Sequence, residues 1–83
     1  DNNETTVIAF KEYENQYVFM SCATGGEYGK LMFVGEDFVE FNIIDIDTMS
    51  YKETMVIYSP LILEVAIGGA DIARIVAELS LKS

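Results

Sequence analysis

The 83-residue chain contains no His and no Trp, and it has one Cys and one Pro. Without His it cannot form a His-ligated metal site, a Ser-His-Asp triad or a Cys-His pair. A single Cys cannot form an intrachain disulfide, so no disulfide framework stabilises the fold. These absences exclude several classes of enzyme and the disulfide-rich class of small domains.

Positive charge is also scarce, because 5 Lys and Arg stand against 14 Asp and Glu, which gives a net charge of −9. Nucleic-acid binding requires clustered Lys and Arg, and anionic lipid headgroups would repel this chain. The longest apolar stretch, 61–79, is interrupted by four charged residues and is therefore not expected to span a membrane. The composition favours a basic protein as the partner, with no direct nucleic acid and no membrane.

Hydrophobic residues make up 51% of the chain, and its mean hydropathy is +0.23. Disordered chains combine high charge with low hydrophobicity, so we expect one folded domain over 1–83, with 1–4 as a disordered tail. A domain this small has a modest core, so its surplus apolar residues predict an interface and a homo-oligomer, in the simplest case a dimer. A single free thiol fits a reducing compartment and predicts a cytoplasmic location.

Segments rich in β-branched and aromatic residues, some of them alternating with polar ones, predict five strands. The first two are expected to form a hairpin joined by a turn at Glu14–Asn15. The glycine-rich stretch 24–29 is predicted to be a flexible loop, and 35–37 a turn. The five predicted strands are 5–13, 16–23, 30–34, 38–47 and 53–58.

Two interpretations remain for the segment 59–82. Its first two residues, Ser and Pro, are favourable at a helix start, which favours one long helix. Alternatively, 61–67 forms an extra strand and 70–82 the only helix, because the Gly-Gly pair between them costs about 1 kcal/mol per glycine inside a helix. We favour the long helix. In either case we predict an α+β domain, an antiparallel β-meander of about five strands with a C-terminal helix packed on one face.

Carboxylates dominate the candidate binding surface. Glu36, Asp37 and Glu40 lie around one predicted turn, and Asp45 and Asp47 follow on the same predicted strand. The last two are spaced like the first ligands of a calcium loop, but the required Gly and final Glu are missing, so we predict no metal site. Spaced carboxylates on a rigid sheet suit docking onto a basic surface, where they can imitate the phosphates of a nucleic acid.

Two smaller groups of residues are also candidates for partner contacts. Three tyrosines flank the first hairpin and the glycine-rich stretch, where an exposed cluster would anchor a partner. A stripe of small residues on the predicted helix would allow another backbone to approach closely, either the chain's own sheet or a second copy. The tyrosines are Tyr13, Tyr17 and Tyr28, and the stripe is Gly69, Ala73 and Ala77. The opposite, buried side of this helix is expected to carry Ile72, Ile75, Val76 and Leu79.

The remaining motifs do not indicate catalysis. Cys22 has neither a His nor a nearby cation to activate its thiol, so we expect a buried structural residue. The glycine-rich stretch 24–29 lacks the spacing of a phosphate-binding loop. We therefore predict a protein that is not an enzyme, with no catalytic residue and no cofactor.

These observations lead to three ranked hypotheses. The first is a small acidic inhibitor or antagonist that masks a basic, nucleic-acid-binding surface of a partner protein. Immunity proteins, anti-defence proteins and DNA mimics share this character, which is an analogy of composition only. The alternative is a homo-oligomeric regulator that binds a small molecule in an apolar pocket between sheet and helix or between subunits. A hydrolase that uses paired carboxylates ranks last, because the sequence does not predict the pocket that such a pair requires.

Overall fold

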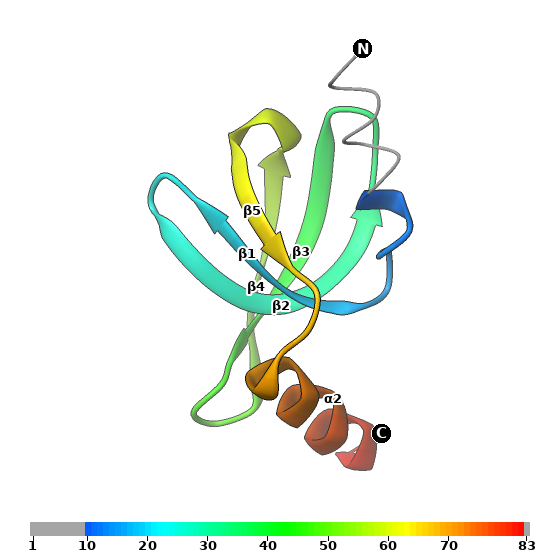
Figure 1. Cartoon of the computed structure of the whole chain (residues 1–83), viewed down its shortest axis with the longest axis vertical. Coiled ribbons are helices and arrows are strands. Elements are labelled where there is room, and N and C mark those ends of the chain that lie inside the picture. Colours follow the sequence, from blue (N-terminus) through cyan, green and yellow to red (C-terminus); the bar gives the residue numbers. More distant parts are fainter. Residues whose placement is uncertain (1–9, 83) are drawn as a thin grey trace.

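The computed structural model describes residues 10–82, which form a five-stranded antiparallel sheet and one C-terminal helix (Figure 1). The predicted α+β class is therefore confirmed. The elements, in chain order, are β1 (Tyr17–Cys22), β2 (Gly25–Val34), β3 (Phe38–Asp45), β4 (Ser50–Tyr58), the 3₁₀ turn η1 (Ser59–Leu61), β5 (Ile62–Ala66) and α2 (Ala70–Lys82).

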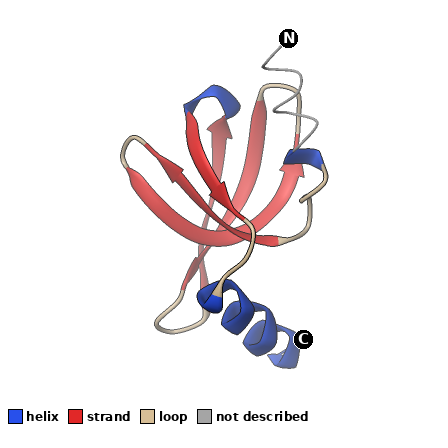
Figure 2. Ribbon diagram, viewed as in Figure 1, coloured by secondary structure: helices blue, strands red, loops and turns tan. Residues whose placement is uncertain are grey.

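The strand order of the sheet is β4-β3-β2-β1-β5, and every neighbouring pair is antiparallel. Strands β1 to β4 form a meander, and β5 then pairs with the other side of β1. Because only the three residues of η1 separate β4 from β5, the two edges of the sheet must approach each other at that corner. The sheet is consequently curled, with a concave and a convex face, as Figure 2 shows.

The glycine-rich stretch 24–29 is not a loop, because all but its first residue belong to β2. Ala23–Thr24 alone form the turn after β1, and Gly25 follows with a φ of 136°, a conformation that glycine adopts without steric cost. Gly26 is then required for packing, because the ring of Phe19 on β1 occupies the space beside it. Glycine therefore serves close packing in this strand rather than flexibility.

Residues 1–9, which include the predicted tail and most of the first predicted strand, lie outside the described residues. The end of that predicted strand is not extended, because the chain is helical at Lys11 and turns before β1. The chain turns at Glu14–Asn15 as predicted, but the described residues before this turn form no strand and β1 pairs with β2 and β5, so this is not the turn of the predicted hairpin. The Glu14 carboxylate accepts hydrogen bonds from Lys11 Nζ and from the Val34 backbone N–H, both at 2.9 Å. These two bonds, with Lys11 contributing more, lower the pKa of Glu14 and attach the turn to β2.

The long helix favoured for 59–82 is wrong, and the alternative interpretation is correct. Ser59 and Pro60 begin only a single 3₁₀ turn, and β5 then pairs with the edge of β1. That pairing gives hydrogen bonds to backbone groups of β1 that would otherwise form an open edge. Gly69, at a φ of 123°, precedes α2, and its carbonyl oxygen accepts a hydrogen bond from the Ala73 N–H at 3.0 Å.

Within residues 10–82, two apolar clusters stabilise the fold, one on each face of the sheet. On the concave face, Phe41 and Leu31 are among the fully buried side chains. On the convex face, Ile75 of α2 packs with Ile44 and Met49. The helix is therefore held at the end of β3, where it also contacts β1.

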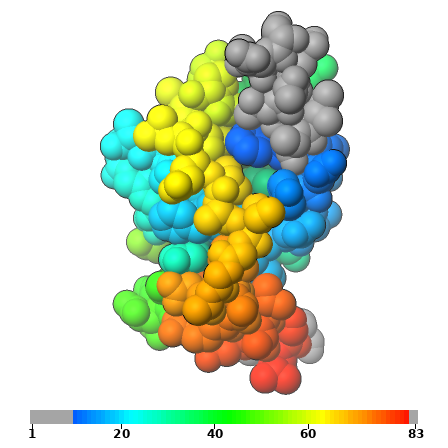
Figure 3. Space-filling view, viewed as in Figure 1, coloured from blue at the N-terminus to red at the C-terminus, as the bar shows by residue number. Residues whose placement is uncertain are grey.

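The helix and the turn between β3 and β4 lie at the same end of the molecule (Figure 3), which measures 40 × 24 × 20 Å. Ile72 and Ile75 are buried as predicted, and Leu79 is half-buried. The prediction for Val76 is wrong, because its side chain is 44% exposed and lies beside the packed side of the helix. Within residues 10–82, no helix combines the length and apolar character needed to cross a membrane.

Candidate functional site

The structure distributes the five predicted carboxylates along β3 and the turns at its two ends. Glu36 and Asp37 lie in the turn before β3, whereas Asp45 ends this strand and Asp47 lies in the next turn. Glu40 lies between them, in the middle of the strand. An eight-residue strand is about 25 Å long, so the carboxylates form two groups at opposite ends of β3.

A cleft of about 370 Å³ opens beside the C-terminal end of β3. It forms because β2 begins at Gly25 but pairs with β3 only from Gly29 onward. Residues from this unpaired part of β2 face the turn that follows β3 across an open space. We call this space the acidic cleft, and its functional side chains are those of Phe19, Glu27, Tyr28, Asp45, Asp47 and Lys52.

An aromatic pair forms one wall of the acidic cleft. Phe19 and Tyr28 lie opposite each other on β1 and β2, with ring centroids 4.9 Å apart and an interplanar angle of 59°. The Tyr28 hydroxyl donates a hydrogen bond to Asp71 Oδ2 at 3.0 Å, which connects this wall to the first turn of α2. That hydrogen bond is the main cause of the raised pKa of Tyr28, so its hydroxyl stays protonated at neutral pH. Both rings are half-buried and leave surface open to the cleft.

The turn after β3 forms the opposite wall of the acidic cleft, and hydrogen bonds between side chains and backbone groups hold it in place. Asp45 Oδ1 accepts hydrogen bonds from the N–H of Asp47 at 2.9 Å and from that of Thr48 at 3.4 Å. Arg74 Nη2 of α2 donates a hydrogen bond to the carbonyl oxygen of Ile46 at 2.6 Å. The turn after β3 is thus attached to the helix, and its hydrogen bonds hold the Asp45 carboxylate in a defined position.

The charges of the acidic cleft favour a cationic ligand. Three acidic residues, Glu27, Asp45 and Asp47, line the cleft, and Lys52 is the one basic residue in its lining. Asp45 is half-buried, whereas Glu27 and Asp47 are exposed, so a cation can approach them from solvent. Among residues 10–82, no three acidic or Cys side chains are grouped closely enough to hold a metal ion. The arrangement suits an organic cation that also contacts the aromatic rings.

The other predicted contact residues do not gather at this cleft. Of the three tyrosines, Tyr28 lines it, Tyr17 packs against the cluster beneath α2, and Tyr13 packs against the concave cluster. The stripe Gly69, Ala73 and Ala77 is exposed, since Ile72 and Ile75 form the packed side of α2. The stripe therefore does not serve packing against the chain's own sheet.

Three cleft residues, Phe19, Glu27 and Lys52, are not among the site residues predicted from the sequence. Glu27 falls in the stretch predicted to be a flexible loop, whereas in the structure it lies on β2 and lines the same cleft as Asp45. Phe19 carries no signal of a site in the sequence, because a phenylalanine on a strand is typical of an apolar core. Its register with Tyr28 could have been found only by assigning 25–29 to a strand after a two-residue turn.

Comparisons with known proteins give no assignment, since no family model, no curated protein and no solved structure matches the chain significantly.

Proposed function

We propose that this protein is a small acidic, non-enzymatic binding protein that masks a basic surface of a partner protein. The observation that carries the proposal is the acidic cleft, which is lined by three acidic residues together with the aromatic pair of Phe19 and Tyr28. In this proposal an Arg or Lys side chain of the partner enters the cleft. The net charge of −9 attracts the basic partner from a distance, which raises the association rate at low salt.

The cleft suits Arg better than Lys. A guanidinium group is planar, can stack on the ring of Phe19 or Tyr28, and can form two parallel hydrogen bonds to a carboxylate such as Asp47. An ammonium group lacks the planar shape for stacking and acts as a point charge. A partner with an exposed Arg within a basic, nucleic-acid-binding surface therefore fits this site.

A titration of the ¹⁵N-labelled protein with a hexa-arginine peptide tests this assignment. At low salt we expect the largest amide shifts at Glu27, Tyr28 and Asp45–Asp47. Replacing Asp45→Asn and Asp47→Asn together should weaken binding about tenfold or more, because two charged acceptors are lost. Asn at position 45 keeps a side-chain oxygen that can accept the two hydrogen bonds of the turn, so the fold should persist.

The matched control removes the same charge from the other end of β3. The double variant Glu36→Gln and Asp37→Asn should weaken peptide binding less than about twofold, through the loss of long-range attraction alone. Hexa-lysine should bind the unchanged protein more weakly than hexa-arginine. Equal losses in the two double variants, or shifts spread evenly over all carboxylates, would show a general charge effect and refute a role for the cleft.

A further inference from the structure

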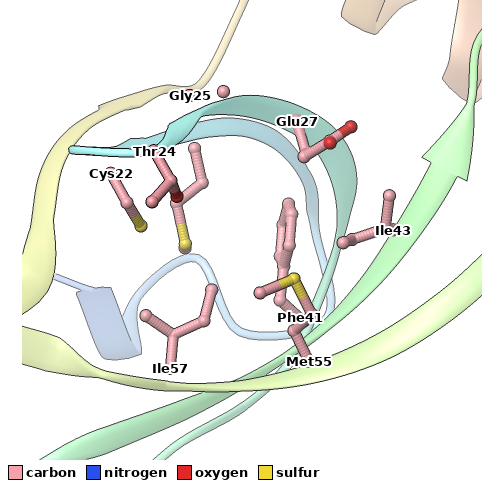
Figure 4. Close-up of a pocket in the computed structure, with 10 residues that line it drawn as sticks. Cys22, Thr24, Gly25, Glu27, Phe41, Ile43, Met55 and Ile57 are labelled. Carbon is pink, nitrogen blue, oxygen red and sulfur yellow. The ribbon is translucent and has the colours of Figure 1, made fainter.

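A second cavity, of about 260 Å³, lies on the concave face of the sheet. It shares Gly26 and Glu27 with the acidic cleft, but the aromatic pair Phe19 and Tyr28 does not line it. Strands β1 to β4 all contribute to it, and no described residue of α2 does. Figure 4 shows Cys22, Phe41, Met55 and Ile57 around this space. Its position inside the curled sheet differs from the pocket between sheet and helix that the sequence suggested.

The cavity exists because the side chains at the turn between β1 and β2 are too small to fill it. A Cβ atom built on Gly25 would meet nothing within 4 Å, so open space continues up to the backbone there. Opposite, Met55 lies across from the buried Phe41 on β3, yet its side chain is 40% exposed. A core-facing methionine that stays accessible indicates an apolar core that the chain leaves partly unfilled.

The lining has almost no charge. Among the residues that surround the cavity, Glu27 is the only ionised one, and Figure 4 shows its carboxylate pointing away from Cys22 and Thr24. Apart from Glu27, the polar side-chain groups of the lining are the Thr24 hydroxyl at the rim and the Cys22 thiol. The sulfur atoms of methionine and cysteine are polarisable, and methionine adapts its shape to different ligands.

We infer that this cavity is a binding site for a small, neutral and mainly apolar molecule. An engineered apolar cavity of about 150 Å³ accommodates benzene, so a space of 260 Å³ suits a ligand of about ten non-hydrogen atoms. A fatty carboxylate of the same size is disfavoured, because the net charge of −9 and the nearby Glu27 repel an anion. A hydroxyl group on the ligand can form a hydrogen bond with Thr24 at the rim.

Cys22 provides a specific reporter for this site, because it is the only cysteine of the chain and lines the cavity. The experiment measures the rate of Cys22 alkylation by iodoacetamide, followed by intact mass, with 1-octanol or sodium octanoate present. A ligand of this size binds with a dissociation constant on the order of 1 mM. We expect 1-octanol near saturation to slow alkylation at least fivefold, and octanoate at the same concentration to change the rate less than twofold.

Two adjacent positions on β4 give a matched pair of variants. Met55→Trp should fill the cavity and abolish the protection by 1-octanol, whereas Val56→Trp, on the opposite face and 65% exposed, should leave it unchanged. Thermal melting of each variant checks that it folds, and 1-octanol should raise the melting temperature of the unchanged protein. Unchanged alkylation with 1-octanol, equal protection by octanoate, or protection that persists in Met55→Trp would overturn the inference. The proposed partner site in the acidic cleft would stand in each of these cases.

Discussion

Gly29 and Gly68 have opposite surroundings, although the sequence gives no reason to distinguish them. A Cβ atom on Gly29 would collide with the Asn42 carbonyl oxygen and lie 2.8 Å from Phe41 Cζ. Backbone on the neighbouring strand cannot move aside without breaking the pairing of β2 with β3. At Gly68 a Cβ atom would meet nothing within 4 Å.

We therefore expect Gly29→Ala to lower the free energy of unfolding by about 2–4 kcal/mol, and Gly68→Ala to change it by less than about 0.5 kcal/mol. Urea denaturation followed by circular dichroism measures both values. Similar values for the two variants would show that β2 and β3 are not packed as closely as the structure indicates.

Single residues also show which parts of the acidic cleft can be predicted from the sequence. Asp45, Asp47 and Tyr28 were identified because charge and aromatic character are visible in the sequence itself. Their separation from Glu36 and Asp37 follows from the predicted strand 38–47, but their position opposite the first residues of β2 does not, because it depends on the pairing of β2 with β3. Grouping carboxylates by sequence distance works within a turn and fails along an extended strand, where each residue adds about 3.3 Å.

At the scale of elements, local preferences predicted most of the strands and were misleading where a tertiary contact decided the structure. The segments at β1, β3 and β4 were found because β-branched and aromatic residues are frequent there. Glycines concealed the first half of β2, since their preference for loops was outweighed by pairing with β1. A favourable Ser-Pro helix start was likewise outweighed at β5, because a strand there completes the edge of β1.

The docking of α2 provides an element-scale prediction. Ile75 is completely buried against Ile44 and Met49, whereas Val76, which the helical pattern also predicted to be buried, is 44% exposed. Ile75→Ala should destabilise the protein by about 2–4 kcal/mol, and Val76→Ala by less than about 1 kcal/mol. Chemical denaturation of the two variants gives the comparison. Equal losses would mean that the helix packs with a different side toward the sheet.

The whole molecule combines a high negative charge with a length of only 40 Å. At about 10 mM salt the Debye length is about 30 Å, so most carboxylates repel one another across the molecule. At about 150 mM salt it falls to about 8 Å, and this repulsion is largely screened. Net repulsion destabilises a compact state, so salt should stabilise this fold.

The same screening should act in opposite directions on stability and on partner binding. Between about 10 and 150 mM NaCl we expect the melting temperature to rise by on the order of 5 °C, which corresponds to about 1 kcal/mol for a domain of this size. Over the same range the hexa-arginine peptide should bind more weakly, because its attraction to the acidic cleft is screened. Sucrose, which stabilises proteins without screening charge, is the control and should raise the melting temperature without weakening the peptide. A melting temperature that falls with NaCl would mean that attractive pairs such as Lys11–Glu14 outweigh the net repulsion.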